Sequence, residues 1–268
     1  MASIEIREMT RADQYYVGTC THLHESKEID ACATRRIAWM EKMIPQGLQV
    51  TTAIADGHPG GFLYLLPIEI CPWGPLGTDL AVIPCLCVEN AFRGKGIGKA
   101  LLEDAEQRSR RAGFKGITLQ AYSHDFWFMP VAFFLKHGFE QVDRRGTLVL
   151  LWKTFDPRAG APRLMESRYQ FHPIAGKVVV DLFWNQFCQT SDIEAQRVRE
   201  VVAEFGDSVI LHKYPAGDRN VLLRYQVSHG IYINGREIFW GYEAPKEGIR
   251  EAIEKALAAG RRWNNQPT

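Results

Sequence analysis

An apolar segment that runs into a glycine-rich turn and then into a helical pattern constrains this chain more than any other feature. Residues Ala81–Val88 form an apolar run of strand length, Arg93-Gly94-Lys95-Gly96-Ile97-Gly98 follows, and apolar residues recur at helical spacing through Ile97–Arg111. Glycine removes the side chains that keep a ligand away from backbone amides. The first turn of a helix carries unpaired N–H donors and a partial positive charge, which stabilise a diphosphate. The segment therefore predicts a strand-to-helix passage with an anion site at the turn.

The spacing of the glycines separates this turn from other phosphate-binding loops. A dinucleotide fingerprint needs G-x-G-x-x-G, and position 99 is Lys, so that pattern fails. The P-loop pattern G-x-x-x-x-G-K-S/T is absent as well. A turn that only joins strand to helix is the alternative interpretation. Arg93 with Lys95 or Lys99 supplies the local positive charge that a pyrophosphate needs, and this favours a ligand site.

The rest of the chain has the pattern of an α/β protein. The period with which apolar residues recur changes repeatedly between two residues, as in strands, and 3.6 residues, as in helices, which indicates mixed α and β structure. Along the first 155 residues we expect strands and helices around a turn at Asp56–Gly60. The expected strands are Ser3–Glu8, Leu48–Ala55, Gly61–Ile70, Ala81–Val88, Ile117–Tyr122 and Thr147–Thr154, and the expected helices are Ala12–Cys20, Ile29–Met43, Ile97–Arg111 and Val131–Lys136.

A second domain is expected after a linker. The 268 residues exceed the usual domain size of ~100–150 residues. Asp156–Pro162 contains two prolines and few apolar residues, so we place domains at 1–155 and 171–268, with a linker at 156–170. In the second domain we expect strands at Lys177–Trp184, Ser208–Lys213, Gly230–Asn234 and Glu237–Tyr242, and helices at Ser191–Glu204 and Pro245–Ala259, the last ending at Gly260.

The composition limits the classes of binding partner and the cellular compartment that we expect. Thirty-two Lys and Arg balance thirty-one Asp and Glu, so no overall field attracts nucleic acid or an anionic membrane. The six cysteines form no C-x-x-C pair, which is typical of reduced thiols and argues against a zinc site. The first residues lack a signal-peptide pattern, and no apolar run approaches the ~20 residues of a membrane span. We therefore expect a soluble cytoplasmic protein without a metal; the oligomeric state stays open.

Two motifs resemble a known enzyme family. Arg93-x-x-Gly96-x-Gly98 resembles the Q/R-x-x-G-x-G/A motif with which the GNAT superfamily of N-acetyltransferases binds acetyl-CoA. Ala132–Phe139 is similar to a later helix of the same family. The resemblance covers residues 1–155 and implies the GNAT fold, with acetyl-CoA as cosubstrate. It implies that the backbones of Leu86, Cys87 and Val88 pair with pantetheine and that Arg93, Gly94, Lys95, Gly96, Ile97, Gly98 and Lys99 bind the pyrophosphate.

The acceptor side of such a site needs a base beside the thioester. His124 and Tyr122 follow the strand Ile117–Tyr122, and Glu69 ends an earlier strand. Imidazole is the most suitable group chemically, although an exposed loop histidine without a catalytic role is an equally good interpretation of His124. Glu69 can alternatively be a solvated carboxylate at a strand end, and Tyr122 can alternatively be a packing residue. Many family members carry a tyrosine acid where this chain has Phe134. We further expect the loops Cys71–Pro75 and Phe126–Pro130 to form acceptor-pocket walls, or the second of them to seal a domain interface.

The second domain resembles a thioredoxin-like opening. Strand residues up to Trp184 are followed by Cys188-Gln189-Thr190-Ser191 at an expected helix start. Ser191 replaces the second cysteine of a dithiol motif, so Cys188 is a possible thiol site without dithiol exchange. The combination of both domains resembles the YoaP-type acetyltransferases.

The sequence thus predicts an N-acetyltransferase that moves an acetyl group from acetyl-CoA to a small-molecule amine by direct attack. Two alternatives stay open. One is a thiol-handling or acyl-CoA-sensing protein that uses Cys188. The other is an acetyltransferase whose protein substrate is recruited by the second domain.

Overall fold

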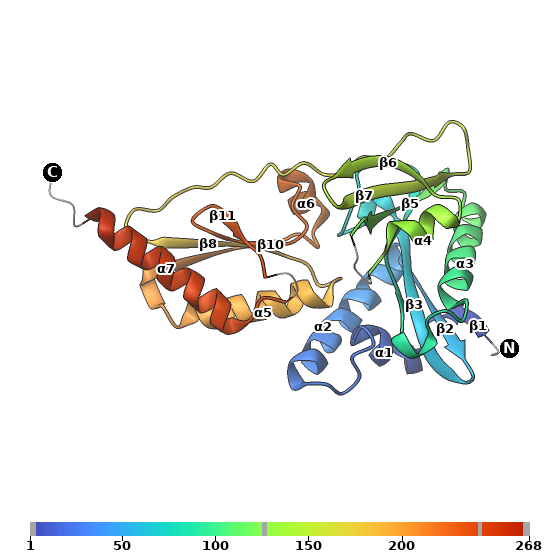
Figure 1. Cartoon of the computed structure of the whole chain (residues 1–268), viewed down its shortest axis with the longest axis horizontal. Coiled ribbons are helices and arrows are strands. Elements are labelled where there is room, and N and C mark those ends of the chain that lie inside the picture. Colours follow the sequence, from blue (N-terminus) through green and yellow to red (C-terminus); the bar gives the residue numbers. More distant parts are fainter. Residues whose placement is uncertain (1–3, 125–127, 241–242, 265–268) are drawn as a thin grey trace. The chain divides into compact units, whose positions relative to one another are not determined.

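The computed structural model describes residues 4–124, 128–240 and 243–264. The chain divides into two compact units, Met1–Met165 and Glu166–Thr268 (Figure 1). Among the described residues, no helix has the length and apolar character needed to cross a membrane. The same residues contain no cluster of three or more His, Cys, Asp or Glu side chains placed to hold a metal ion.

The first unit is built on a seven-stranded sheet with helices on both faces. Its strand order is β1-β2-β3-β4-β5-β7-β6, and within the described residues β4 and β5 are the one parallel pair of neighbouring strands in this sheet. The strands are β1 (Ile4–Glu8), β2 (Gln49–Ala55), β3 (His58–Pro67), β4 (Leu80–Val88), β5 (Gly116–Tyr122), β6 (Glu140–Arg145) and β7 (Leu148–Thr154). The helices are α1 (Gln14–Gly18), α2 (Lys27–Met43), α3 (Ile97–Arg111) and α4 (Val131–Lys136), with short 3₁₀ turns at Arg11–Asp13, Ile44–Gln46, Ile68–Ile70 and Asn90–Phe92.

Alternation along β3 explains how both faces of the sheet are covered. Successive strand side chains point to opposite faces. Leu63 and Leu65 pack in the core cluster that contains Ile97 and Leu101 of α3. Phe62 and Tyr64 face the other way, where their rings meet Tyr16 of α1 and Trp39 of α2 edge to face. One strand therefore carries two apolar stripes, each with its own helix layer.

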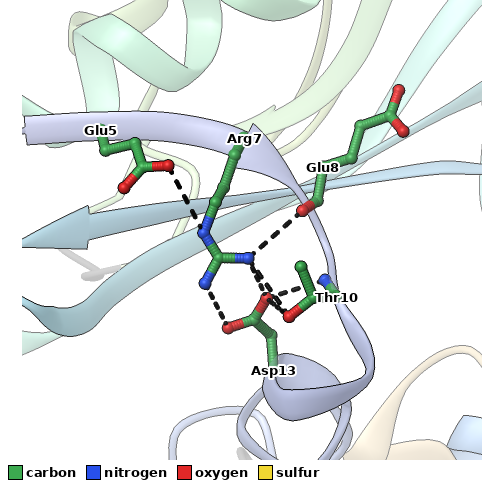
Figure 2. Close-up of polar contacts among 5 residues, drawn as sticks. All are labelled: Glu5, Arg7, Glu8, Thr10 and Asp13. Atoms are coloured by element: carbon green, nitrogen blue, oxygen red, sulfur yellow. Dashed lines mark hydrogen bonds and ion pairs between the residues drawn. The ribbon is translucent and has the colours of Figure 1, made fainter.

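An ion-pair cluster fixes the start of the first unit (Figure 2). Arg7 on β1 donates through Nη1 and Nη2 to the carboxylate of Asp13 at 2.6 and 2.9 Å. The Thr10 amide and hydroxyl donate to the same carboxylate at 2.8 and 2.7 Å. Burial alone would raise the pKa of Asp13, but these hydrogen bonds and the guanidinium charge hold that pKa below its usual range. Asp13, which is 4% exposed, therefore keeps its charge inside the fold.

The predicted elements of the first unit are present, but several bounds differ. The expected helix Ala12–Cys20 is the 3₁₀ turn Arg11–Asp13 followed by α1, which ends at Gly18, and the expected strand Gly61–Ile70 ends at Pro67, where the 3₁₀ turn Ile68–Ile70 follows. The turn after β2 is shorter than expected. Asp56 and Gly57 take left-handed backbone angles, φ 51° and 81°, and form a two-residue hairpin turn, so that His58 and Pro59 already pair with β2. The strand β6 was not predicted, because Glu140–Arg145 is polar and mostly exposed. It lies at the edge of the sheet and needs no apolar face of its own.

The second unit has a four-stranded sheet in the order β11-β10-β8-β9. Strands β8 (Val178–Trp184) and β9 (Val209–Pro215) are parallel, whereas β10 (Gly230–Ile233) is antiparallel to both β8 and β11 (Arg236–Ile238). Helices α5 (Gln189–Ala203) and α7 (Lys246–Asn264) pack on this sheet in one apolar cluster. The Asn234-Gly235 turn between β10 and β11 is left-handed, φ 48° and 79°, which is typical of a two-residue hairpin turn.

The second unit differs from the sequence expectations in one additional helix and in the ends of several elements. Helix α5 begins at Gln189 rather than Ser191, and β9 continues to Pro215 rather than ending at Lys213. The helix α6 (Arg219–Tyr225) was not predicted; it begins where the Asp218 side chain accepts from the Asn220 amide at 2.8 Å. The last helix was expected to end at Gly260, but α7 continues to Asn264 because Gly260 lacks the left-handed angle of a helix stop. The expected strand Glu237–Tyr242 ends at Ile238, and its last two positions lie outside the described residues.

Candidate active site

The paired strands β4 and β5 separate toward their carboxyl ends. Their parallel register covers only Leu80–Val82 against Gly116–Thr118. Pro84 marks the point of separation, because proline has no N–H for a sheet ladder. On its other side β4 has a register shift against β3 at the same level, between Val82 and Cys85. Beyond it, Cys85–Val88 continues in register with β3 alone.

The glycine-rich turn begins directly after this separated part of β4. Gly94 and Gly96 take left-handed backbone angles, φ 76° and 92°, that disfavour any other residue. A Cβ at either position would meet no atom within 4 Å, so the space beside both is open. Gly96 is the N-cap of α3, and its carbonyl accepts the first helical hydrogen bond, from Ala100 at 3.0 Å.

The amides of the first turn of α3 point out of the helix. The first amides of any helix have no acceptor within it. In α3 these are the amides of Ile97, Gly98 and Lys99, directly after the left-handed Gly96. The amides of Arg93 and Lys95 instead donate at 3.3 and 3.4 Å to the carbonyls of Asn90 and Phe92. The turn thus presents three helical amides together, which is the geometry that receives an anion.

Cations lie around these amides without filling the turn. Lys95 Nζ lies 4.8 Å from the centre of the Phe92 ring. Lys99 pairs with Glu103 at 3.6 Å on the exposed face of α3. Arg93 is exposed as well. All three ends can reach an anion at the helix start, and their exposure keeps the energetic cost of their charges low.

Helix α4 borders the same turn with aromatic rings. A Cβ on Gly98 would lie 3.3 Å from the ring of Phe133, so glycine at this position leaves room for that ring. Phe134, the next residue of α4, is fully buried in the core, with edge-to-face contacts to Phe133 and Phe139. The residue at this position therefore packs the core, which is the physical reason that it is apolar here.

The structure brings His124 and Tyr122 to the separated end of the sheet. Tyr122 is the last residue of β5, and parallel strands present their carboxyl ends at the same edge. The His124 ring is exposed and lies 5.5 Å from the Tyr122 ring, centre to centre. The Tyr122 amide donates to the carbonyl of Met129 at 2.9 Å, so the chain after His124 returns along β5.

Glu69 lies at the opposite end of β4. Its Oε1 accepts from the amide of Asp79, directly before β4 begins, at 2.8 Å. Leu86 is ~20 Å further along the strand at ~3.3 Å per residue. The structure therefore does not bring Glu69 together with His124. The expected wall Cys71–Pro75 precedes β4 at the same far end, where the Cys71 thiol donates to the Trp73 carbonyl at 2.9 Å. Of the second expected wall, residues 125–127 lie outside the described residues.

Cys188 occupies the N-cap position of α5 in the second unit. Its amide donates to Asn185 Oδ1 at 3.0 Å, and Asn185 is in turn held by Ser191 and Ser228. The thiol is half-buried. Ser191 stands where a dithiol motif has its second cysteine. Its hydroxyl stabilises the loop by accepting a hydrogen bond from the Asn185 amide at 3.0 Å.

Comparison with known proteins finds a family match inside the first unit. Residues 47–141 match the family model described as the acetyltransferase (GNAT) domain. The matched residues include β4, the glycine-rich turn, α3 and β5. This chain contains a GNAT acetyltransferase domain. The acetyltransferase domain thus holds both the separated strands and the open helix start described above.

Solved structures provide further similarities to the acetyltransferase domain. A PaiA N-acetyltransferase from Thermoplasma acidophilum in complex with coenzyme A is 20% identical, covering 57% of this chain and 99% of that one, with a TM-score of 0.42. A putative acetyltransferase, YncA, from Salmonella typhimurium with acetyl-CoA is 20% identical, covering 59% and 96%, with a TM-score of 0.44. A ribosomal-protein-alanine N-acetyltransferase from Brucella melitensis is 19% identical, covering 56% and 99%, with a TM-score of 0.45. A comparison with curated protein sequences gives no match.

Proposed function

We propose that the first unit transfers an acetyl group from acetyl-CoA to the amine of a small molecule by direct attack. The observation that carries this proposal is the acetyltransferase match over residues 47–141, which contains the open start of α3. The amides of Ile97, Gly98 and Lys99 would hold the pyrophosphate, with Arg93 and Lys95 as nearby cations and Gly94 and Gly96 shaping the turn. The separated backbone of Leu86, Cys87 and Val88 would pair with the pantetheine arm as an added strand.

The chemistry requires an amine nitrogen beside the thioester carbonyl. The nitrogen lone pair attacks the carbonyl carbon, the C–S bond breaks, and the CoA thiolate leaves while the amine loses a proton. Holding both reactants in place supplies much of the rate enhancement. In this proposal His124 accepts the proton that the amine loses, and Tyr122 supplies a neighbouring hydroxyl, because both residues lie at the carboxyl end of β5. Glu69 at the far end of β4 is the weaker candidate.

No acid is needed at the position of Phe134. A thiol has a pKa near ~8.5, so a thiolate is a tolerable leaving group at neutral pH. Phe134 is fully buried in the core, with Phe139 against it. Departure of the CoA thiolate without a side-chain acid is therefore part of this proposal.

A thiol-release assay with a panel of small amines, run beside calorimetry with CoA, tests the proposal. We expect heat of binding with CoA and release of free thiol with at least one amine. Gly96→Glu should abolish both, because a carboxylate would repel the diphosphate at the amides that hold it. Gly113→Glu is the matched control, since Gly113 also has a left-handed angle, φ 81°, and open space at the other end of α3. Binding of CoA without any acetyl transfer would turn the proposal toward acyl-CoA sensing.

For the second unit we propose a thioredoxin-like domain that recruits a substrate or partner. The parallel β8–β9 pair, the antiparallel β10 and the placement of Cys188 at the start of α5 support this proposal. A protein acceptor is then the alternative to a small amine. Acetylation of a cell lysate by the full chain, read by mass spectrometry, separates the two: labelled proteins favour the recruited substrate, and labelled metabolites favour the small amine.

A further inference from the structure

A cavity of about 610 Å³ lies in the first unit beside the C-terminal end of α3. Its walls come from the end of β1, the 3₁₀ turn after α2, the start of β2 and the last turn of α3. Small-molecule sites commonly have volumes of about 300–1,000 Å³. Helix α3 has 15 residues with a rise of ~1.5 Å each, so the cavity lies ~20 Å along the helix from the anion turn. It is therefore separate from that turn, and no local sequence pattern marks it, because four distant segments form it.

Strand alternation places two polar side chains of the sheet on the side of this cavity. Thr51 of β2 faces α3, because its hydroxyl donates to the Asp104 carboxylate at 3.3 Å. Gln49, two residues earlier, lies on the same face and lines the cavity. Glu8 of β1 pairs with Thr51 in register, and its side chain points away from the Arg7–Asp13 cluster (Figure 2). Both Gln49 and Glu8 therefore lie between the sheet and the last turn of α3.

The side-chain amide of Gln49 has an unmet hydrogen bond. Its Oε1 atom is buried, and no donor reaches it from any residue that the structure describes. A buried acceptor without a donor is unfavourable. Rotation about the terminal side-chain bond exchanges Oε1 with Nε2, so the amide can offer the cavity either an acceptor or a donor. A ligand with an amide of its own would complement Gln49 in either orientation.

The arginines in the last turn of α3 differ in how their charges are compensated. Arg108 donates to two carboxylates, at 2.6 and 2.7 Å. The guanidinium of Arg110 lies 3.9 Å from the centre of the Phe155 ring and does not line the cavity. Arg111 lines the cavity, and among the described residues it has no acidic partner. A helix C-terminus favours a basic residue in any case, but a single uncompensated guanidinium beside the unmet amide of Gln49 suits a ligand with one carboxylate.

We propose that this cavity binds a small N-acylated amino acid with an aliphatic side chain. The ligand carboxylate pairs with Arg111, and the ligand amide pairs with Gln49. The aliphatic side chain covers Ile44, a lining residue that is 44% exposed. The C-terminal residue of a peptide carries the same three groups and is the other source of this chemistry.

The ligand also has the chemistry of a reaction product. An acetylated amino acid is what the first unit would release if its acceptor is an amino acid, and the cavity would then be a second site for that product. This consequence rests on the proposed function. The binding chemistry of the cavity is independent of it, because Arg111 and Gln49 take no part in holding acetyl-CoA.

Titration calorimetry of the full chain with N-acetyl-L-leucine tests the proposal. Wild type should bind it at least tenfold more tightly than N-acetyl-L-leucinamide, which lacks the carboxylate. Arg111→Gln should remove that difference between the two ligands, because the charge that recognises the carboxylate is gone. Arg110→Gln is the matched control: it removes the same charge from the same helical turn and should bind both ligands as wild type does. Gln49→Met, which has no amide, should weaken the binding of both.

An acetylated tripeptide that ends in leucine separates the two sources of the ligand. Tighter binding of N-acetyl-L-leucine than of the tripeptide assigns the cavity to the small molecule. Tighter binding of the tripeptide, with the same loss in Arg111→Gln, assigns it to a peptide C-terminus and overturns the small-molecule assignment.

Three further results would overturn the inference. One is the absence of binding of either ligand at millimolar concentration, and another is an affinity for N-acetyl-L-leucine that Arg111→Gln leaves unchanged or that Arg110→Gln lowers equally. The third is competition with CoA, since saturating CoA at the other end of α3 should leave this affinity unchanged. If the chain binds N-acetyl-L-leucine as expected but binds no CoA, the proposed function fails and this inference stands.

Discussion

Replacing Gly96 by alanine separates the binding role of the turn from its backbone strain. Gly96 has φ 92° at the N-cap of α3, and Gly113 has φ 81° just beyond the other end of the helix. A Cβ meets no atom within 4 Å at either position, so both changes introduce the same kind of strain and no clash. The cost of a left-handed conformation with a Cβ is ~1–2 kcal/mol.

The two variants should share a stability loss and differ in CoA binding. For a unit of this size each kcal/mol lowers Tm by about 2–4 °C, so we expect a loss of about 2–8 °C in both Gly96→Ala and Gly113→Ala. Relief of the strain at Gly96 turns the amides of Ile97 and Gly98 away from the anion. A hydrogen bond to a charged group contributes about 1.5–3 kcal/mol, so CoA should bind about 10–100-fold more weakly to Gly96→Ala.

Differential scanning calorimetry and titration calorimetry with CoA measure both quantities on the same protein. Gly113→Ala should bind CoA like wild type. If Gly96→Ala also binds CoA like wild type while losing stability, the first turn of α3 does not hold the diphosphate. The same conclusion follows if both variants lose affinity equally, because the effect would then come from the stability of the whole helix.

Four further results are expected. His124→Gln should lower kcat about 10²–10⁴-fold in the thiol-release assay and leave the CoA affinity measured by calorimetry unchanged. An unchanged kcat would rule out His124 as the base. Phe134→Tyr should lower the free energy of unfolding by about 1–3 kcal/mol without raising kcat, because its hydroxyl would be buried in an apolar cluster. Asp13→Asn should be destabilising at pH 7 in urea melts, and the difference from wild type should shrink as pH falls below ~4: the native pKa is lowered, so its stabilisation exists above the unfolded pKa and disappears as the carboxylate protonates. Cys20→Gly should be more stable than Cys20→Ala by ~1 kcal/mol in the same melts, since only alanine keeps a Cβ at φ 51°, and equal stabilities would contradict the assigned strain.

Much of the fold follows from local patterns in the sequence. Helix α3 is predicted with both ends correct, because Gly96 and Gly113 mark its limits and its apolar residues repeat at helical spacing. Strand β6 escapes prediction because an edge strand needs no apolar alternation. The hairpin turn at Asp56-Gly57 shows the opposite case, in which a cluster of turn residues suggests a longer loop than the backbone uses.

The candidate site could be predicted only where it is continuous in the sequence. Residues Arg93–Lys99 form one segment, and their type and spacing alone indicate an anion site. Glu69 belongs to the connection that enters β4 at its amino end, whereas the anion turn follows the carboxyl end, so chain order separates the two once β4 is recognised as one strand.

The short register between β4 and β5 divides the first sheet into two halves. Among the described strands, β1 to β4 are joined to β5, β7 and β6 only by the pairing of Leu80–Val82 with Gly116–Thr118. A molecule lying between the separated ends would replace backbone hydrogen bonds that the chain itself does not form there. Binding should then slow amide hydrogen exchange in both halves at once, because the ligand would bridge them.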